Sequence, residues 1–225
     1  MPRLDVWLTE QKLFSSRQVA KRAIRAGGVT VDGKLAKPST WISGKEKILV
    51  NDCASNAPQG YSKLMAIESA LDIQFVSPGI LALDIGSSAG GFLTYLAEKG
   101  AKVIGLEFSG DFFIQLSEIS EKYPDVSVLL CDAFEVDPMI ICGPNELDLL
   151  LVDVTTNPDN TITLTKRFTP LLKQGGMIVV AMKIKPTSEE LHVLQDRLAE
   201  LGYRDIQKVI LDQSRQEVHL IAIHQ

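Results

Sequence analysis

The stretch ILALDIGSSAGGF, residues 80–92, constrains the fold of this chain more than any other feature. Its first half is apolar, which predicts a buried strand of a parallel sheet with Asp84 near its end. Gly86, Gly90 and Gly91 then permit a sharp turn in which the backbone approaches a ligand before a helix begins. A strand, a glycine-rich turn and a helix predict an α/β domain that binds a nucleotide-like ligand at this turn.

Apolar segments alternate with helical segments beyond residue 60. We predict a helix at about residues 61–72 and strands at about residues 80–85, 102–107, 126–131, 147–153 and 176–182. This alternation is typical of a doubly wound, mostly parallel Rossmann-like α/β sheet that is covered on both faces. Two more strand-like segments, near residues 206–211 and 217–223, are expected to add an antiparallel edge.

The charged residues divide the chain into two modules. Residues 1–60 contain ten Lys or Arg and five Asp or Glu, whereas residues 61–225 contain thirteen and twenty-three. The 225 residues also exceed a usual single domain. We therefore expect a small basic domain at residues 1–50, a polar linker at residues 51–60 and an acidic domain at residues 61–225. The positive charge of the first domain favours a polyanionic partner.

Composition argues against several other classes of protein. No apolar run approaches the roughly 20 residues that span a bilayer, and the first residues lack the pattern of a signal peptide. We therefore expect a cytoplasmic protein without a membrane span. The three cysteines lie far apart and the three histidines are poorly grouped, so we expect neither a disulfide framework nor a bound metal.

The basic domain contains a helix with a positively charged face. Ser15 and Gln18 fit a capping box, and Arg17, Lys21 and Arg25 recur every fourth residue. The sequence VTVDGKLA then predicts a hairpin with its turn at residues 32–33, and residues 48–50 a further short strand. A charged helix face is also what a plain solvated surface shows.

This series of elements resembles the small α+β RNA-binding domain named after ribosomal small-subunit protein four. The resemblance covers about residues 2–50, and SSRQVAKRAIRAGGVTVDGK is its most specific part. It implies phosphate contacts, which do not depend on base sequence, by six basic residues: Arg3, Arg17, Lys21, Arg22, Arg25 and Lys34.

Four consecutive predicted strands end in an acidic residue: Asp84, Glu107, Asp132 and Asp153. Ligands of open α/β sheets bind beyond the carboxyl ends of the strands, so we expect these side chains to converge on one crevice. S-adenosylmethionine fits such a crevice, with its ribose hydroxyls on Glu107, its adenine amine on Asp132 and its methionine part at Asp84. NAD is the alternative, because Glu107 follows Gly86 by 21 residues, but the G-x-x-x-G-G spacing differs from G-x-G-x-x-G.

The glycine loop LDIGSSAGGF resembles the D-[LIV]-G-x-x-x-G-G-[FW] loop of FtsJ-like methyltransferases. Both domains together resemble the TlyA group of ribosomal RNA 2′-O-methyltransferases, which are often labelled haemolysins, over nearly the whole chain. The resemblance implies ribosomal RNA or a ribosomal subunit as partner and S-adenosylmethionine as cofactor. It implies cofactor contacts by Asp84, Gly86, Ser87, Ser88, Gly90, Gly91, Phe92, Glu107, Phe108, Asp132 and Ala133.

FtsJ-like enzymes carry a Lys-Asp-Lys-Glu tetrad around the ribose 2′-hydroxyl. The matching positions here are Lys63, Asp153, Lys183 and Glu217. The resemblance implies that Lys183 is the general base, a role that requires a lowered pKa. Carboxylates at Asp153 and Glu217 oppose that shift, so we interpret them as groups that orient the lysines and the ribose.

Other functions stay open at this point. An amine methyltransferase would carry Asn or Asp before Pro-Pro and an aromatic residue, which Asn157-Pro158 matches in part. A ring-carbon methyltransferase needs a nucleophilic cysteine, and neither Cys131 nor Cys142 lies in a recognisable motif. The remaining alternatives are a non-catalytic RNA- or ribosome-binding protein and a haemolysin that acts on membranes.

Overall fold

A computed structural model of the chain divides into an N-terminal unit, Met1–Ala66, and a C-terminal unit, Ile67–Gln225. It describes residues 1–14, 16–25, 29–32, 34–50, 59–187 and 189–225. The boundary between the two units falls within helix α4 (Gln59–Leu71). The predicted linker, residues 51–60, lies outside the described residues except for its last two.

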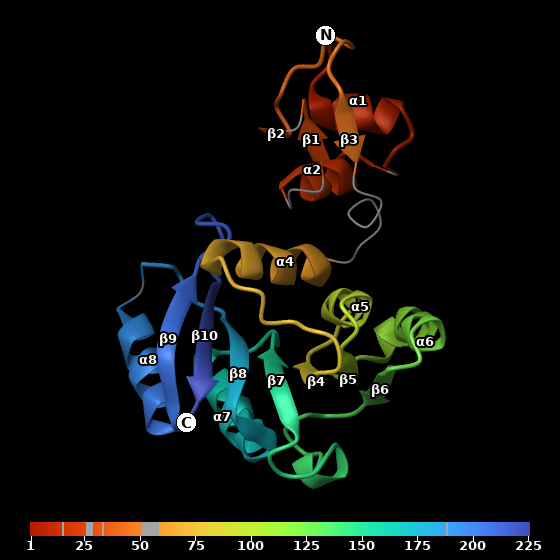
Figure 1. Cartoon of the computed structure of the whole chain (residues 1–225). Coiled ribbons are helices and arrows are strands. Elements are labelled where there is room, and N and C mark those ends of the chain that lie inside the picture. The colour runs from red at the N-terminus through yellow and green to blue at the C-terminus, as the bar shows by residue number, and fades with distance from the viewer. Residues whose placement is uncertain (15, 26–28, 33, 51–58, 188) are drawn as a thin grey trace. The chain divides into compact units, whose positions relative to one another are not determined.

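The N-terminal unit combines two helices with a small antiparallel sheet (Figure 1). The helices are α1 (Leu4–Glu10) and α2 (Arg17–Arg25), and the strands, in the order β2-β1-β3, are β1 (Val29–Val31), β2 (Lys34–Leu35) and β3 (Ile48–Val50). This confirms the predicted hairpin and third strand. The buried apolar core consists of Leu4, Leu8, Phe14, Ala20, Ala23, Ile24, Val29 and Ile42.

The start of α2 differs by one residue from the predicted capping box. The hydroxyl of Ser16 accepts a hydrogen bond from the backbone N–H of Val19 at 3.3 Å, so Ser16 supplies a cap of the helix. Ser15, the predicted cap, lies outside the described residues.

The C-terminal unit is built on a seven-stranded sheet in the order β6-β5-β4-β7-β8-β10-β9 (Figure 1). Strands β4 to β8 are parallel, and β10 and β9 are antiparallel additions at one edge, as predicted. The strands are β4 (Leu81–Ile85), β5 (Lys102–Glu107), β6 (Val126–Leu130), β7 (Leu147–Val152), β8 (Leu172–Met182), β9 (Tyr203–Val209) and β10 (Val218–His224). The remaining helices are α5 (Gly91–Glu98), α6 (Phe113–Lys122), α7 (Pro158–Phe168) and α8 (Glu190–Glu200), with short 3-10 helices η1 (Gly110–Phe112), η2 (Pro138–Ile140) and η3 (Thr169–Leu171).

Strand β7 shows that the sheet is covered on both faces. Successive strand residues point to opposite faces, and all four residues from Leu149 to Val152 are at most 1% exposed. Apolar side chains on both faces are the pattern of a parallel sheet between two helical layers. The predicted doubly wound α/β class is therefore confirmed.

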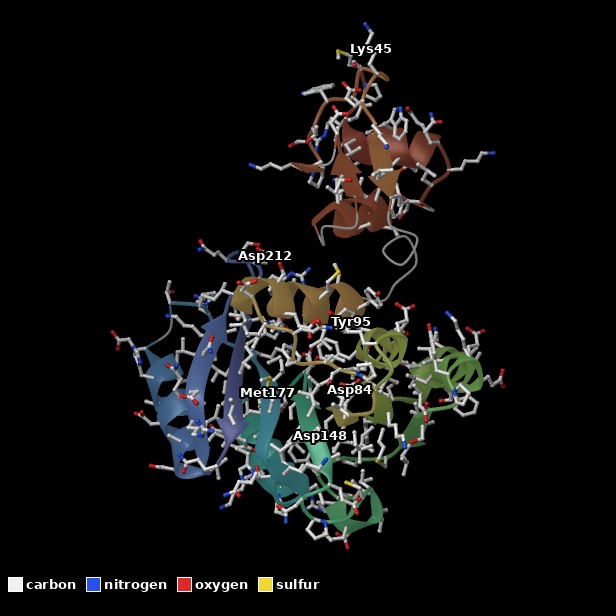
Figure 2. All side chains as sticks on the ribbon, viewed as in Figure 1. Lys45, Asp84, Tyr95, Asp148, Met177 and Asp212 are labelled. Atoms are coloured by element: carbon white, nitrogen blue, oxygen red, sulfur yellow. The ribbon has the colours of Figure 1, made fainter. Side chains whose placement is uncertain are left out.

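The order of the strands locates the ligand-binding edge. From β4 the chain moves outward through β5 and β6, and then returns to β7 on the other side of β4. Adjacent strands β4 and β7 therefore form the topological switch point, and ligands of open α/β sheets bind beyond the carboxyl ends of the strands at such a point. Figure 2 shows Asp84, near the carboxyl end of β4, and Asp148, near the amino end of β7.

Candidate active site

The glycine turn between β4 and α5 passes very close to the segment that follows β7. Gly86 has a φ of +91°, and a Cβ added there would lie 2.5 Å from the backbone oxygen of Asp153. Gly90, with a φ of 76°, caps the start of α5 in the left-handed conformation. Only glycine fits the Gly86 position without strain or displacement of the segment after β7. Glycine at this position therefore lets the turn lie directly against the segment after β7, at the switch point.

Glu107 connects this turn to the next strand. One of its carboxylate oxygens accepts a hydrogen bond from the backbone N–H of Ser88 and the other accepts one from the backbone N–H of Ser109, both at 2.7 Å. Since a carboxylate oxygen has two lone pairs, each still has acceptor capacity for a ligand. Glu107 is 8% exposed at the end of β5, so it is a preorganised acceptor beside the glycine turn.

The side chains of the other predicted cofactor residues differ in their solvent exposure. Asp132 accepts a hydrogen bond from the backbone N–H of Phe134 at 2.8 Å through one oxygen. Phe108 is 77% exposed, whereas Phe92 is 5% exposed and Asp84 is fully buried. Any ligand contact of Phe92 would therefore come from its backbone, at the start of α5, rather than from its ring.

Three members of the predicted tetrad meet beyond the ends of β7, β8 and β10. The ammonium of Lys183 lies 2.5 Å from a carboxylate oxygen of Asp153 and 2.5 Å from one of Glu217. Each of the three residues adjoins the end of a different strand, so the sheet itself brings them together. Lys63 lies on α4 in the part that belongs to the N-terminal unit, and it is not placed relative to the other three.

The charges at this site favour a protonated lysine. Burial lowers the pKa of Lys183, but the carboxylates of Asp153 and Glu217 outweigh burial and hold the pKa above its ordinary value. Two carboxylates around one ammonium also give the cluster a net negative charge. The site is therefore suited to a cationic ligand, and Lys183 carries its proton in the absence of one.

His219 is a member of this cluster that no sequence pattern revealed. It is 1% exposed on β10, and its Nε2 lies 3.4 Å from the second carboxylate oxygen of Glu217. The only signal in the sequence is one polar residue within the apolar run VHLIAI. His219 and Lys183 thus contact different oxygens of the Glu217 carboxylate.

Two alternatives lose their support from this geometry. Asn157 is the cap of α7, where its side-chain oxygen accepts a hydrogen bond from the backbone N–H of Asn160 at 2.9 Å, and Pro158 takes the first helical position. The Asn-Pro pair is therefore a helix start. Burial raises the pKa of the Cys131 and Cys142 thiols. Nearby carboxylates raise each pKa further, Asp132 that of Cys131 and Glu146 that of Cys142. Both thiols are therefore poor nucleophiles.

Three predicted RNA contacts of the N-terminal unit converge on one buried acid. Asp5 is fully buried on α1, and its carboxylate lies 3.2 Å from Nε of Arg3, 3.0 Å from Nη2 of Arg17 and 3.7 Å from Nζ of Lys21. We call these four residues the Asp5 cluster. Asp5 was not predicted from the sequence, where it appears as one acid between apolar residues of a short helix. The side chains of Arg22, Arg25 and Lys34 lie outside the described part of the structure.

We also searched the described residues for metal-binding groups and for membrane-spanning helices. Across the described ranges, no group of three His, Cys, Asp or Glu side chains could hold a metal ion. None of the helices in the same ranges is long and apolar enough to cross a membrane.

Two family models match separate parts of the chain. The model of the S4 domain matches residues 2–48, and the model of the FtsJ-like methyltransferase matches residues 57–202. The second match covers more than half of the sequence and includes the glycine turn, Asp153 and Lys183. The fold and the site define a Rossmann-like methyltransferase class. Within that class, the chain belongs to the FtsJ-like methyltransferase family.

One curated relative and two solved structures are similar to this chain. The 16S/23S rRNA (cytidine-2'-O)-methyltransferase TlyA of Mycobacterium tuberculosis is 36% identical over 157 residues, which cover 68% of this chain and 56% of the relative. This chain thus spans little more than half the length of that protein. Aeropyrum pernix fibrillarin with bound S-adenosyl-L-methionine superposes with a TM-score of 0.62 at 19% identity, over 90% of this chain and 87% of its own. The fibrillarin pre-rRNA processing protein of Methanococcus jannaschii gives a TM-score of 0.60 at 20% identity, over 82% and 81%.

Proposed function

We propose that this protein is an S-adenosylmethionine-dependent RNA methyltransferase that methylates a ribose 2′-hydroxyl in ribosomal RNA. The observation that carries the proposal is the Lys183 ammonium held between Asp153 and Glu217, where the backbone of Asp153 lies against Gly86 of the glycine turn. The TlyA relative, whose name gives a cytidine 2′-O-methyltransferase of ribosomal RNA, supports the same substrate class.

The described residues fit S-adenosylmethionine. Gly86 and Gly90 allow the turn to pack closely against Asp153 and Ile119, and Glu107 has acceptor capacity for two hydroxyl groups. The net negative charge around Lys183 suits a sulfonium cation. We assign the cofactor to Asp84, Gly86, Ser87, Ser88, Gly90, Gly91, Phe92, Glu107, Phe108, Asp132 and Ala133. When bound, the cofactor supplies a methyl group on a sulfonium that is already a good leaving group.

The catalytic residues then have to align the hydroxyl and remove its proton. We assign alignment to Asp153 and Glu217, which fix the nitrogen of Lys183, and include Lys63 as the fourth member of the tetrad. Lys183 holds a proton in the protein alone, so it has to lose that proton before it accepts one from the ribose. A bound cation nearby lowers the pKa of an ammonium by like-charge repulsion, which favours this loss.

The N-terminal domain, residues 1–50, is assigned to RNA binding, residues 51–60 to a linker and residues 61–225 to methyl transfer. The six basic residues named above, three of which belong to the Asp5 cluster, supply the phosphate contacts. Ribosomal RNA as the substrate supports a cytoplasmic location.

Methyl transfer from labelled S-adenosylmethionine to ribosomal RNA tests this function. We expect Lys183→Ala to abolish transfer while S-adenosylmethionine still binds in calorimetry, because the ribose-facing cluster does not include the glycine turn. Lys208→Ala, which removes an exposed lysine of β9, is the matched control and should transfer at the normal rate. Full activity of Lys183→Ala, or calorimetric binding of NAD in place of S-adenosylmethionine, would disprove the proposal.

A further inference from the structure

Trp41 is an exposed aromatic side chain beside the Asp5 cluster. Its exposed fraction is 64%. Residues 40–42 run antiparallel to residues 2–4, because the backbone N–H of Leu4 donates to Thr40 at 2.7 Å and that of Ile42 donates to Pro2 at 3.0 Å. Arg3 and Trp41 are thus directly opposed in an isolated bridge.

The hydrogen-bond pattern of this bridge fixes the relation of the two side chains. The two bonds flank the Arg3–Trp41 pair and do not join its members, so this is a non-hydrogen-bonded antiparallel pair. Such pairs have the shorter Cα separation, about 4.5 Å, and their side chains project to the same face. The side chains of Trp41 and Arg3 therefore leave the backbone side by side on the same face.

The cations of the Asp5 cluster also remain accessible. Side-chain exposure is 40% for Arg3, 52% for Arg17 and 37% for Lys21, although each contacts the buried carboxylate. Three cations around one carboxylate leave a net positive charge. The shared carboxylate fixes their relative positions, so the cluster is a preorganised anion site rather than three independent surface charges.

We propose that Trp41 and the Asp5 cluster together bind one unpaired nucleotide of RNA, with its base stacked on the indole and its phosphate on the cations. The inference rests on the RNA-binding role proposed above and adds which part of the RNA is recognised. An exposed tryptophan alone is ordinary on a protein surface, but a rigid cation cluster beside it matches the two parts of a nucleotide. Paired bases are already stacked, so a duplex would engage the cations only.

Fluorescence measures the stacking directly. The chain has two tryptophans, Trp7 and Trp41, so Trp7→Phe leaves Trp41 as the sole indole. The experiment uses the full chain with this substitution and two probes: a hairpin RNA with an adenine loop and a fully paired RNA duplex of the same length. The hairpin should quench the emission of Trp41 and the duplex should bind without quenching it.

Affinity separates stacking from charge. In the same background, Trp41→Ala should weaken hairpin binding about tenfold and leave duplex binding unchanged, because stacking on an aromatic residue contributes to the first probe alone. Trp41→Phe should keep most of the hairpin affinity. Leu49→Ala, which removes another exposed apolar side chain (51%) from the same unit, is the matched control and should bind both probes normally.

The outcomes distinguish this inference from the function on which it rests. If the unsubstituted chain binds neither RNA, the RNA-binding role is wrong and the nucleotide site with it. If it binds both, but Trp41→Ala binds the hairpin as tightly as its parent or binds both probes equally weakly, the RNA-binding role stands and the nucleotide site is wrong.

Discussion

Replacement of Gly86 by alanine tests whether the close packing of the glycine turn against Asp153 holds this tetrad residue in position. Gly86 has a φ of +91°, and the added Cβ would lie 2.5 Å from the backbone oxygen of Asp153 and 3.0 Å from a methyl group of Val154. Real Cβ atoms do not approach backbone oxygens so closely, so the segment after β7 must move. We expect Gly86→Ala to destabilise the fold and to displace Asp153 from Lys183.

The two contributions to this destabilisation can be separated. A side chain in the left-handed region costs about 1–2 kcal/mol. Overpacking against surroundings that cannot relax costs about 1–3 kcal/mol more. Gly79 has a φ of +84° but no atom within 4 Å of an added Cβ, so Gly79→Ala carries the first contribution alone.

Urea denaturation of both variants gives the comparison. The free energy of unfolding should fall about 1–3 kcal/mol further in Gly86→Ala than in Gly79→Ala. Methyl transfer should fall about tenfold or more in Gly86→Ala only, because small displacements of catalytic groups slow chemistry strongly. Equal decreases of stability in the two variants, or normal transfer by Gly86→Ala, would refute the close coupling of the turn to Asp153.

Other variants probe separate parts of the protein. Burial raises the pKa of Tyr203 to about 12, although the hydrogen bond with Thr169 lowers it, so the neutral phenol stabilises the fold fully below pH 10 and this contribution is lost as the pH rises towards 12. In urea titrations across that range, Tyr203→Phe should remove about 2–3 kcal/mol of pH dependence relative to the unsubstituted chain. Glu68 accepts hydrogen bonds from two backbone N–H groups, the Tyr95 hydroxyl and Lys99, so Glu68→Ala should destabilise the fold by about 3 kcal/mol or more, against little change for the exposed Glu118→Ala. In RNA-binding titrations, Arg17→Ala with Lys21→Ala should reduce the salt slope by about 0.9 for each phosphate that is no longer neutralised, and an unchanged slope would mean a solvated helix face.

The apolar periodicity of the sequence predicts the sheet because both sides of its central strands are buried. Strands β4 and β5 match the predicted ranges within one residue. Strand β8 begins four residues before its predicted start, since residues 173–175 are polar or glycine and lack an apolar pattern. That part of the strand is fixed by tertiary contacts, including the ion pair between Lys173 and Asp148 at 2.6 Å.

The candidate site is less visible in the sequence than the sheet. The resemblance to FtsJ-like enzymes groups Asp153, Lys183 and Glu217 in one tetrad, and in the structure the Lys183 ammonium lies 2.5 Å from each of the two carboxylates. An acid at a strand end, however, does not reveal where its side chain points, and Asp84 is fully buried. Contacts between segments distant in sequence, such as Asp5 with Arg17 of α2 and Lys183 with Glu217, depend on tertiary packing that no local pattern encodes.

The position of the transferred methyl group tests the central claim most directly. Ribosomal RNA methylated by the protein with labelled S-adenosylmethionine is digested to nucleosides, and the label is located by mass spectrometry. We expect label on a ribose 2′-oxygen, none with Lys183→Ala or Lys183→Arg, and none on RNA with 2′-deoxyribose at the target nucleotide, which lacks the nucleophile. Label on a base, or transfer to the 2′-deoxy substrate, would contradict ribose 2′-O-methylation by this site.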